Sequence, residues 1–136
     1  MDYTFELNEK LPADLEKVNP FIERVLQAFS SVLRSCEDIF KIKLALEEAL
    51  TNAVRHGNKL KPDSFVHVSV KAGPKQFLID VHDEGRGFDY KSVPDPTTRD
   101  NADKISGRGV FLMRRIMDTV DFYDNGSGVR MVKNLP

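Results

Sequence analysis

The chain has 136 residues, enough for one ordinary domain and too few for two, so we expect a single domain over residues 1–136. Its 20 basic and 21 acidic residues nearly cancel, which argues against direct binding of nucleic acid or membranes through overall charge. Cys36 is the only cysteine, which excludes an intrachain disulfide and a cysteine-rich zinc site. With no signal-like N-terminus and no long apolar run, we expect a cytoplasmic protein.

The first half of the chain predicts one strand and two helices. Polar and apolar residues alternate over residues 3–7, which favours a short strand, and residues 11–14 (L-P-A-D) are typical of a turn. Apolar residues recur at helical spacing over 18–33 and predict an amphipathic helix. A second helix is expected over 37–56, with Gly57 at the position where helices commonly end.

The middle of the chain predicts a hairpin and then a long loop. Residues 65–71 alternate between apolar and polar side chains, residues 72–75 (A-G-P-K) are typical of a turn, and 76–82 continues as a second strand. Residues 89–105 carry both signs of charge and few apolar side chains. A loop of that length in a compact domain is usually a lid, a binding loop or a disordered segment.

The remaining residues predict one helix and a second hairpin. Residues 110–117 have helical apolar spacing, and strands are expected over 119–123 and 129–134 around the D-N-G turn at 124–126. Two long helices, a hairpin, one helix and a final hairpin favour an α+β fold. We expect a two-layer α/β sandwich, a mostly antiparallel mixed sheet with helices on one face.

The second predicted helix carries an acid and an amide four residues apart. At about 100° per residue, Glu48, Asn52 and Arg55 fall within about 60° of arc, beside the apolar face of the helix. A carboxylate can accept a proton from a hydroxyl, and an amide oxygen suits magnesium. Taken alone, however, the pair is as easily an ordinary polar pair on a solvated helix face.

Two glycine-containing motifs follow. In D-E-G-R-G-F at 83–88, Asp83 comes just after a strand, where its carboxylate could accept a hydrogen bond from an exocyclic amine such as that of adenine. In S-G-R-G at 106–109, the glycines precede a helix, whose N-terminal N–H groups attract phosphate. Each motif alone also fits a simple turn or helix cap. Neither the Walker A motif nor the G-x-G-x-x-G fingerprint occurs.

Together and in this order, the three motifs resemble those of the GHKL ATPase superfamily. E-A-L-T-N-A-V-R-H-G at 48–57 is similar to its first box, D-E-G-R-G-F at 83–88 to its second and S-G-R-G-V-F-L-M at 106–113 to its third. The tail G-S-G-V-R-M-V-K at 126–133 is similar to its last box, with Ser127 where a threonine is usual. Within the superfamily the chain looks most like the small bacterial anti-sigma factors that are also serine-protein kinases, from about residue 10 to its end.

This resemblance implies the Bergerat fold, with ATP and Mg²⁺ held between helices and sheet under a flexible lid. By position, Glu48 would be the general base and Asn52 the magnesium ligand, and Asp83 would bind the adenine amino group. Two pairs of glycines would contact the nucleotide, Gly85 and Gly87 at the adenine and Gly107 and Gly109 at the phosphates. The other nucleotide contacts implied by the matched boxes are Arg55, Phe88, Lys104, Ser106, Arg108, Val110 and Ser127.

The resemblance also implies a function and its partners. An enzyme of this kind transfers the γ-phosphoryl group of ATP to a serine of a small anti-sigma-factor antagonist, and it binds a sigma factor. One departure stands against it: Ile105 occupies the place where the family's kinases carry an arginine, with Arg99, Lys104 and Arg108 as candidate replacements. The alternative is a nucleotide-dependent binding module that sequesters its partner without efficient phosphotransfer. A third hypothesis is that the chain is the detached ATP-binding domain of a histidine kinase. The sequence does not decide whether the protein forms a homodimer.

Overall fold

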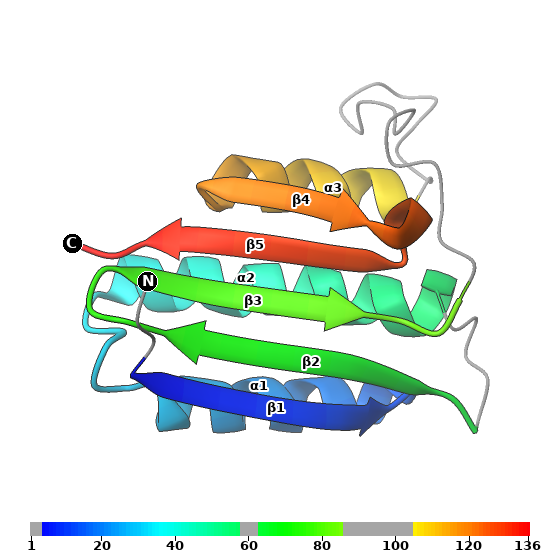
Figure 1. Ribbon diagram of the computed structural model, residues 1–136, viewed down its shortest axis with the longest axis horizontal. Coiled ribbons are helices and arrows are strands. Elements are labelled where there is room, and N and C mark those ends of the chain that lie inside the picture. The colour runs from blue at the N-terminus through cyan, green and yellow to red at the C-terminus, as the bar shows by residue number, and fades with distance from the viewer. Residues whose placement is uncertain (1–3, 58–62, 86–104) are drawn as a thin grey trace.

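The computed structural model describes residues 4–57, 63–85 and 105–136. Within these ranges a sheet forms one layer and helices form the other (Figure 1). In chain order the strands and α-helices are β1 (Phe5–Pro12), α1 (Val18–Ala28), α2 (Cys36–Asn52), β2 (Phe65–Ala72), β3 (Gln76–His82), α3 (Ile105–Ile116), β4 (Thr119–Tyr123) and β5 (Gly128–Asn134). Short helical turns lie at Leu15–Lys17, Ala53–Gly57 and Asp124–Gly126.

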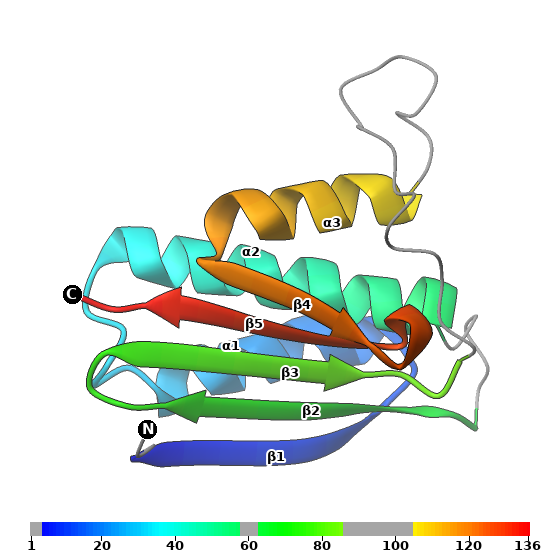
Figure 2. The same cartoon turned by 45° about the horizontal axis from the view of Figure 1, so that its top comes forward.

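The five described strands pair in the order β1-β2-β3-β5-β4, and every pairing is antiparallel. Two views show α1, α2 and α3 on one face of this sheet, and none of the described helices lies on the other (Figures 1 and 2). The predicted α+β two-layer sandwich is therefore confirmed. Of the described helices, none is long and apolar enough to cross a membrane.

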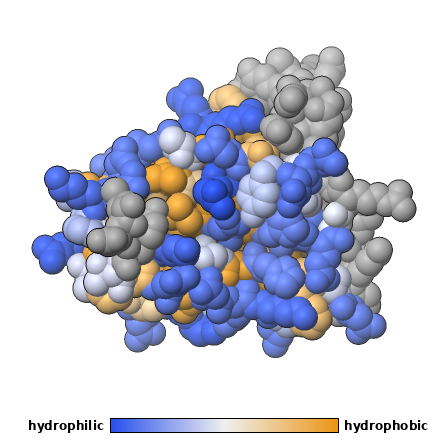
Figure 3. Space-filling model, in the orientation of Figure 1, coloured by the Kyte–Doolittle hydropathy of each residue, from blue (hydrophilic) through white to orange (hydrophobic). Residues whose placement is uncertain are grey.

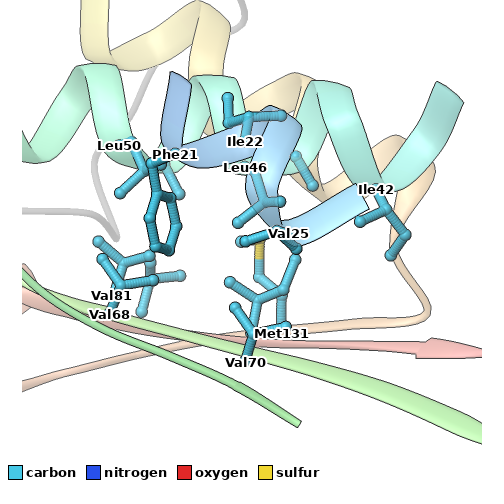
Figure 4. Close-up of a cluster of buried hydrophobic side chains, with 14 of the residues drawn as sticks. Phe21, Ile22, Val25, Ile42, Leu46, Leu50, Val68, Val70, Val81 and Met131 are labelled. Carbon is cyan, nitrogen blue, oxygen red and sulfur yellow. The ribbon is translucent and has the colours of Figure 1, made fainter. Parts of the chain in front are cut away.

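The core lies between the two layers. The apolar face of β2 is buried through Val66, Val68 and Val70, while His67 on the other face is exposed, as the alternation predicts. The side of α2 expected to face the sheet is also buried; its members Ile42, Leu46, Ala49 and Ala53 are at most 5% exposed. Figure 4 shows side chains from α1 and α2 meeting those of β2, β3 and β5. Burying one such large apolar side chain stabilises the fold by roughly 1.5–3 kcal/mol.

The predicted boundaries are wrong at two places in the first part of the chain. The strand β1 extends to Pro12, whereas we expected a turn there, and it pairs with β2 along its whole length. A proline is tolerated because β1 is an edge strand, with one side free of ladder hydrogen bonds. Helix α1 ends at Ala28 instead of continuing to Leu33, which is nevertheless buried in the core after a turn.

Both later helices also differ from expectation. Helix α2 begins at Cys36, whose thiol is exposed, after the Ser35 side chain accepts a hydrogen bond from the Asp38 N–H. Its last turn, Ala53–Gly57, has π-helical hydrogen bonding. Helix α3 begins at Ile105, before the predicted start at residue 110, so the S-G-R-G motif lies inside its first turns. Glycines disfavour a helix by about 1 kcal/mol each, and packing of α3 against α2 overrides that preference.

Candidate active site

The motifs of the sequence meet at one end of the molecule. The C-terminal end of α2, the end of β3, the start of α3 and the turn Asp124–Gly126 all lie there in both cartoon views (Figures 1 and 2). The two helices pack directly against each other, and the last residue of β3, His82, pairs with Gly128, where β5 begins just after the turn. The fold therefore brings together four segments that are separated in the sequence.

Glu48 and Asn52 lie on one side of α2, half-buried at the border of the core. Their spacing of four residues places the two side chains next to each other on the helix. A Cβ atom built on Gly109 would lie 2.6 Å from Asn52 Nδ2 and 2.9 Å from Glu48 Oε2. The carboxylate and the amide of α2 thus converge on the backbone of α3.

Gly109 is needed here because of that close approach. Real Cβ atoms essentially never come within 3.0 Å of another heavy atom, so any side chain at this position would displace Glu48 and Asn52. Without a side chain, the α3 backbone leaves both polar groups in place. The sequence predicted the glycine as a phosphate contact; the structure adds that it makes room for the acid and the amide.

Asp83 follows β3 directly and is only 6% exposed. Its Oδ1 accepts a hydrogen bond of 2.7 Å from the N–H of Gly85, and no other described residue is recorded as donating to its carboxylate. Burial raises the pKa of Asp83, while the Gly85 hydrogen bond and the nearby His82 partly oppose that rise. A buried carboxylate with spare acceptor capacity suits an amino group with directed N–H donors, such as that of adenine.

Ser127 lies beside Asp83 and directly precedes β5. Its carbonyl oxygen accepts a hydrogen bond of 2.9 Å from the Asp83 N–H, and its hydroxyl donates to the carbonyl oxygen of Asp124 at 2.8 Å. Asp124 and Asn125 both have positive φ, which tightens the turn that leads into Ser127. The serine is 7% exposed, so the last box and the second box form one buried corner.

The other predicted nucleotide contacts are only partly described. Arg55 is exposed at the end of α2, and Val110 is 1% exposed in the core, which leaves only its backbone for a ligand. Three predicted contacts, Gly87, Phe88 and Lys104, lie outside the described residues. For Ser106, Gly107 and Arg108 the backbone lies in α3, and their roles stay predictions.

Sequence reasoning missed two residues that fix the position of Asp83. Glu84 accepts a hydrogen bond of 3.0 Å from the Phe65 N–H, and this bond ties the end of β3 to the start of β2. The other Glu84 oxygen lies 3.4 Å from His67 Nε2, a longer contact at the surface. His82 Nε2 lies 3.1 Å from Asp124 Oδ2. The cross-strand distances that create these bonds depend on strand register, and no local pattern in the sequence signals them.

Known proteins are similar to this chain over most of its length. The model of the histidine kinase-like ATPase domain family matches residues 11–133. The serine-protein kinase RsbW of Staphylococcus epidermidis is 30% identical over 132 residues, covering 91% of this chain and 83% of the relative, and RsbW of Staphylococcus aureus strain MRSA252 is 32% identical with the same coverage. The anti-sigma F factor of Bacillus cytotoxicus is 30% identical over 137 residues, covering 96% and 92%. The chain therefore belongs to the histidine kinase-like ATPase domain family, with the Bergerat-type α+β fold, in the group that contains RsbW kinases and anti-sigma F factors.

Proposed function

We propose that this protein is an ATP-dependent anti-sigma regulator that phosphorylates a serine of a small anti-sigma-factor antagonist and also binds a sigma factor. The observation that carries the proposal is the convergence of Glu48 and Asn52 on the backbone of Gly109. A base and a metal ligand placed beside a glycine-containing helix start suit phosphoryl transfer, in which positioning and charge stabilisation supply most of the catalysis. The names of the relatives support the same class of activity.

In this proposal Glu48 accepts the proton of the substrate serine hydroxyl as the serine oxygen attacks the γ-phosphorus, and ADP leaves. Asp83 accepts a hydrogen bond from the adenine amino group and orients the nucleotide. Asn52 would hold Mg²⁺, which would offset the charge of the phosphates. Its amide oxygen is a hard ligand, and magnesium commonly binds one or two protein oxygens together with phosphates and water. Such a site fits the described residues, among which no larger cluster of metal-ligating side chains occurs.

Ile105 favours a second candidate function, a binding module that holds its partner in a nucleotide-dependent way without efficient phosphotransfer. This residue begins α3, at the position where the related kinases are expected to carry an arginine. An arginine near a transferring phosphoryl group offsets developing negative charge, so its replacement by an apolar side chain lowers the expected rate.

One experiment separates the two functions. Purified protein is incubated with γ-labelled ATP, Mg²⁺ and the antagonist encoded beside it, and both label transfer and complex formation are measured. The kinase proposal predicts a labelled antagonist, whereas the binding module predicts a stable complex without label. Glu48→Gln should keep nucleotide affinity and lose roughly 10²–10⁴-fold in rate, the usual effect of removing a positioned base. Wild-type phosphotransfer by this variant would show that Glu48 is not the base.

A further inference from the structure

His82 is the last residue of β3 and follows the buried Val81, so the alternation of a strand places it on the sheet face opposite the core. None of the described helices covers that face (Figure 2). Figure 3 shows that face as largely hydrophilic. A pocket of about 570 Å³ opens on it, lined in part by His67, Asp80, His82 and Tyr123. The His82 side chain is 36% exposed, so its ring can exchange protons with solvent although its backbone leads directly into the buried Asp83.

The contacts of the ring identify which nitrogen carries a proton. Nε2 lies 3.1 Å from Asp124 Oδ2 and 3.4 Å from the hydroxyl oxygen of Ser127. The Ser127 hydroxyl already donates its only proton to the Asp124 carbonyl oxygen, so toward Nε2 it can act only as an acceptor. The Asp124 carboxylate is likewise an acceptor. Nε2 must therefore be protonated, and uptake of a second proton at Nδ1 makes the bond to Asp124 charge-assisted.

These contacts connect the open face of the sheet to the candidate adenine site. The turn that His82 binds leads into Ser127, whose carbonyl oxygen accepts the hydrogen bond from the Asp83 N–H. The positive charge of a protonated His82 also favours the ionised Asp83 carboxylate, which is the form that accepts two hydrogen bonds. Protonation of His82 can thus affect the buried Asp83 in two ways. It strengthens the contact with the turn that leads to Ser127, and its positive charge stabilises the Asp83 carboxylate electrostatically.

We propose that His82 is a positioning residue that couples adenine-nucleotide affinity to pH, binding being tighter when its ring is protonated and bonded to Asp124. This inference rests on the proposed binding of ATP at Asp83. Histidine is the side chain that ordinarily changes charge between pH 5 and 8, and this general range sets the two pH values of the test below.

Other charged or titratable groups surround the ring and must be controlled. Tyr123 of β4 stacks on it with centroids 5.6 Å apart, and His67 of β2 is its direct cross-strand partner. On the same face, the Asp80 carboxylate accepts hydrogen bonds from the Tyr123 hydroxyl and from Arg130 Nε, so each of its two oxygens already has a partner. His67 provides a matched control, because it lies on the same face and its ring contacts Glu84 at 3.4 Å instead of Asp124 or Ser127.

The test measures affinity for ADP at pH 6.0 and 8.0 at fixed ionic strength, for the wild type, His82→Gln, His82→Ala and His67→Gln. Glutamine keeps a neutral N–H donor toward Asp124 but cannot gain charge. Only the wild-type ring can gain charge beside Asp83, and the effect of a partly exposed charge is small. We therefore expect the ratio of affinities at the two pH values to be on the order of threefold larger in the wild type than in His82→Gln. The titration of ADP itself is common to all four proteins and cancels in this comparison.

The variants separate the possible results. The proposal predicts that His82→Gln binds nearly as well as the wild type at pH 8.0, that His82→Ala is weaker at both pH values, and that His67→Gln keeps the wild-type ratio. The proposal is wrong if His82→Gln keeps the wild-type ratio of ADP affinities at pH 6.0 and 8.0, or if His67→Gln lowers that ratio as much as His82→Gln does. Either result would leave the proposed binding of nucleotide unaffected. If the wild type binds no ADP at either pH, the proposed function itself fails, and this inference fails with it.

Discussion

Gly109→Ala should separate catalysis from stability in this protein. The added Cβ atom would lie 2.6 Å from Asn52 Nδ2, 3.3 Å from Asn52 Cγ and 2.9 Å from Glu48 Oε2. Ordinary van der Waals contact begins near 3.4 Å, so the amide nitrogen must move by about 0.8 Å and the carboxylate oxygen by about 0.5 Å. Both atoms are the far ends of flexible side chains, which can rotate away without moving either helix.

Gly109→Ala should therefore change the stability of the fold little and lower the rate of phosphotransfer strongly. Replacing glycine by alanine inside a helix gains up to about 1 kcal/mol of helix propensity, which offsets the cost of rotating two polar side chains. A misplacement of about 1 Å in a catalytic group can cost roughly 10²-fold in rate. We expect Gly109→Ala to unfold at or above the wild-type temperature and to phosphorylate the antagonist on the order of 10²-fold more slowly.

The assay compares thermal unfolding and single-turnover label transfer for Gly109→Ala, with Arg115→Ala as a control on the exposed side of α3. The control should retain the wild-type rate. A Gly109→Ala rate within about threefold of the wild type would refute the placement of the acid and amide against this backbone, since a shift of that size should cost far more. A large loss of stability would refute the argument that only side-chain ends must move.

Two further predictions concern stability. Gly128→Ala should destabilise the fold by roughly 1–3 kcal/mol in denaturant unfolding, because its Cβ would lie 2.3 Å from the ring of Tyr123, which is held by Asp80 and stacked on His82; wild-type stability would show that the ring is free to move. Asp83→Asn should be at least as stable as the wild type at pH 7. Burial raises the pKa of the Asp83 carboxyl group above its ordinary value of 3.8 in the folded state. The wild type therefore loses folding stability as the pH rises from 3.8 through the pKa of the folded state. The difference between the two proteins should vanish below that range, and a less stable Asp83→Asn at neutral pH would contradict the assigned direction.

Much of the fold follows from local patterns in the sequence. The hairpin strands β2, β3 and β4 were predicted within one residue at either end, because alternation and turn residues define them. The start of α3 was not predicted, because its glycines weaken the helical pattern in the sequence. Only the contact with α2 explains why a helix forms there. Likewise, Pro12 suggested a turn, and only the edge position of β1 explains its place in a strand.

Some contacts of the candidate site could likewise be predicted from the sequence, and others could not. Glu48 and Asn52 are four residues apart, so their proximity could be predicted from helix geometry. The approach of Gly109 to that pair, and the contacts of His82 and Glu84 that hold the end of β3, depend on how distant segments pack. Such contacts have no signature in a single sequence, because they are set by register and by the angle between helices.

The central claim is that the buried carboxylate at position 83 recognises the adenine ring, and titration calorimetry on the purified protein tests it most directly. The account predicts that ATP with Mg²⁺ binds the wild type, that GTP binds far more weakly, and that Asp83→Asn loses about 10–100-fold in ATP affinity, the usual value of a hydrogen bond to a charged group. Equal affinities of the wild type and Asp83→Asn for ATP, or equal binding of ATP and GTP by the wild type, would contradict it.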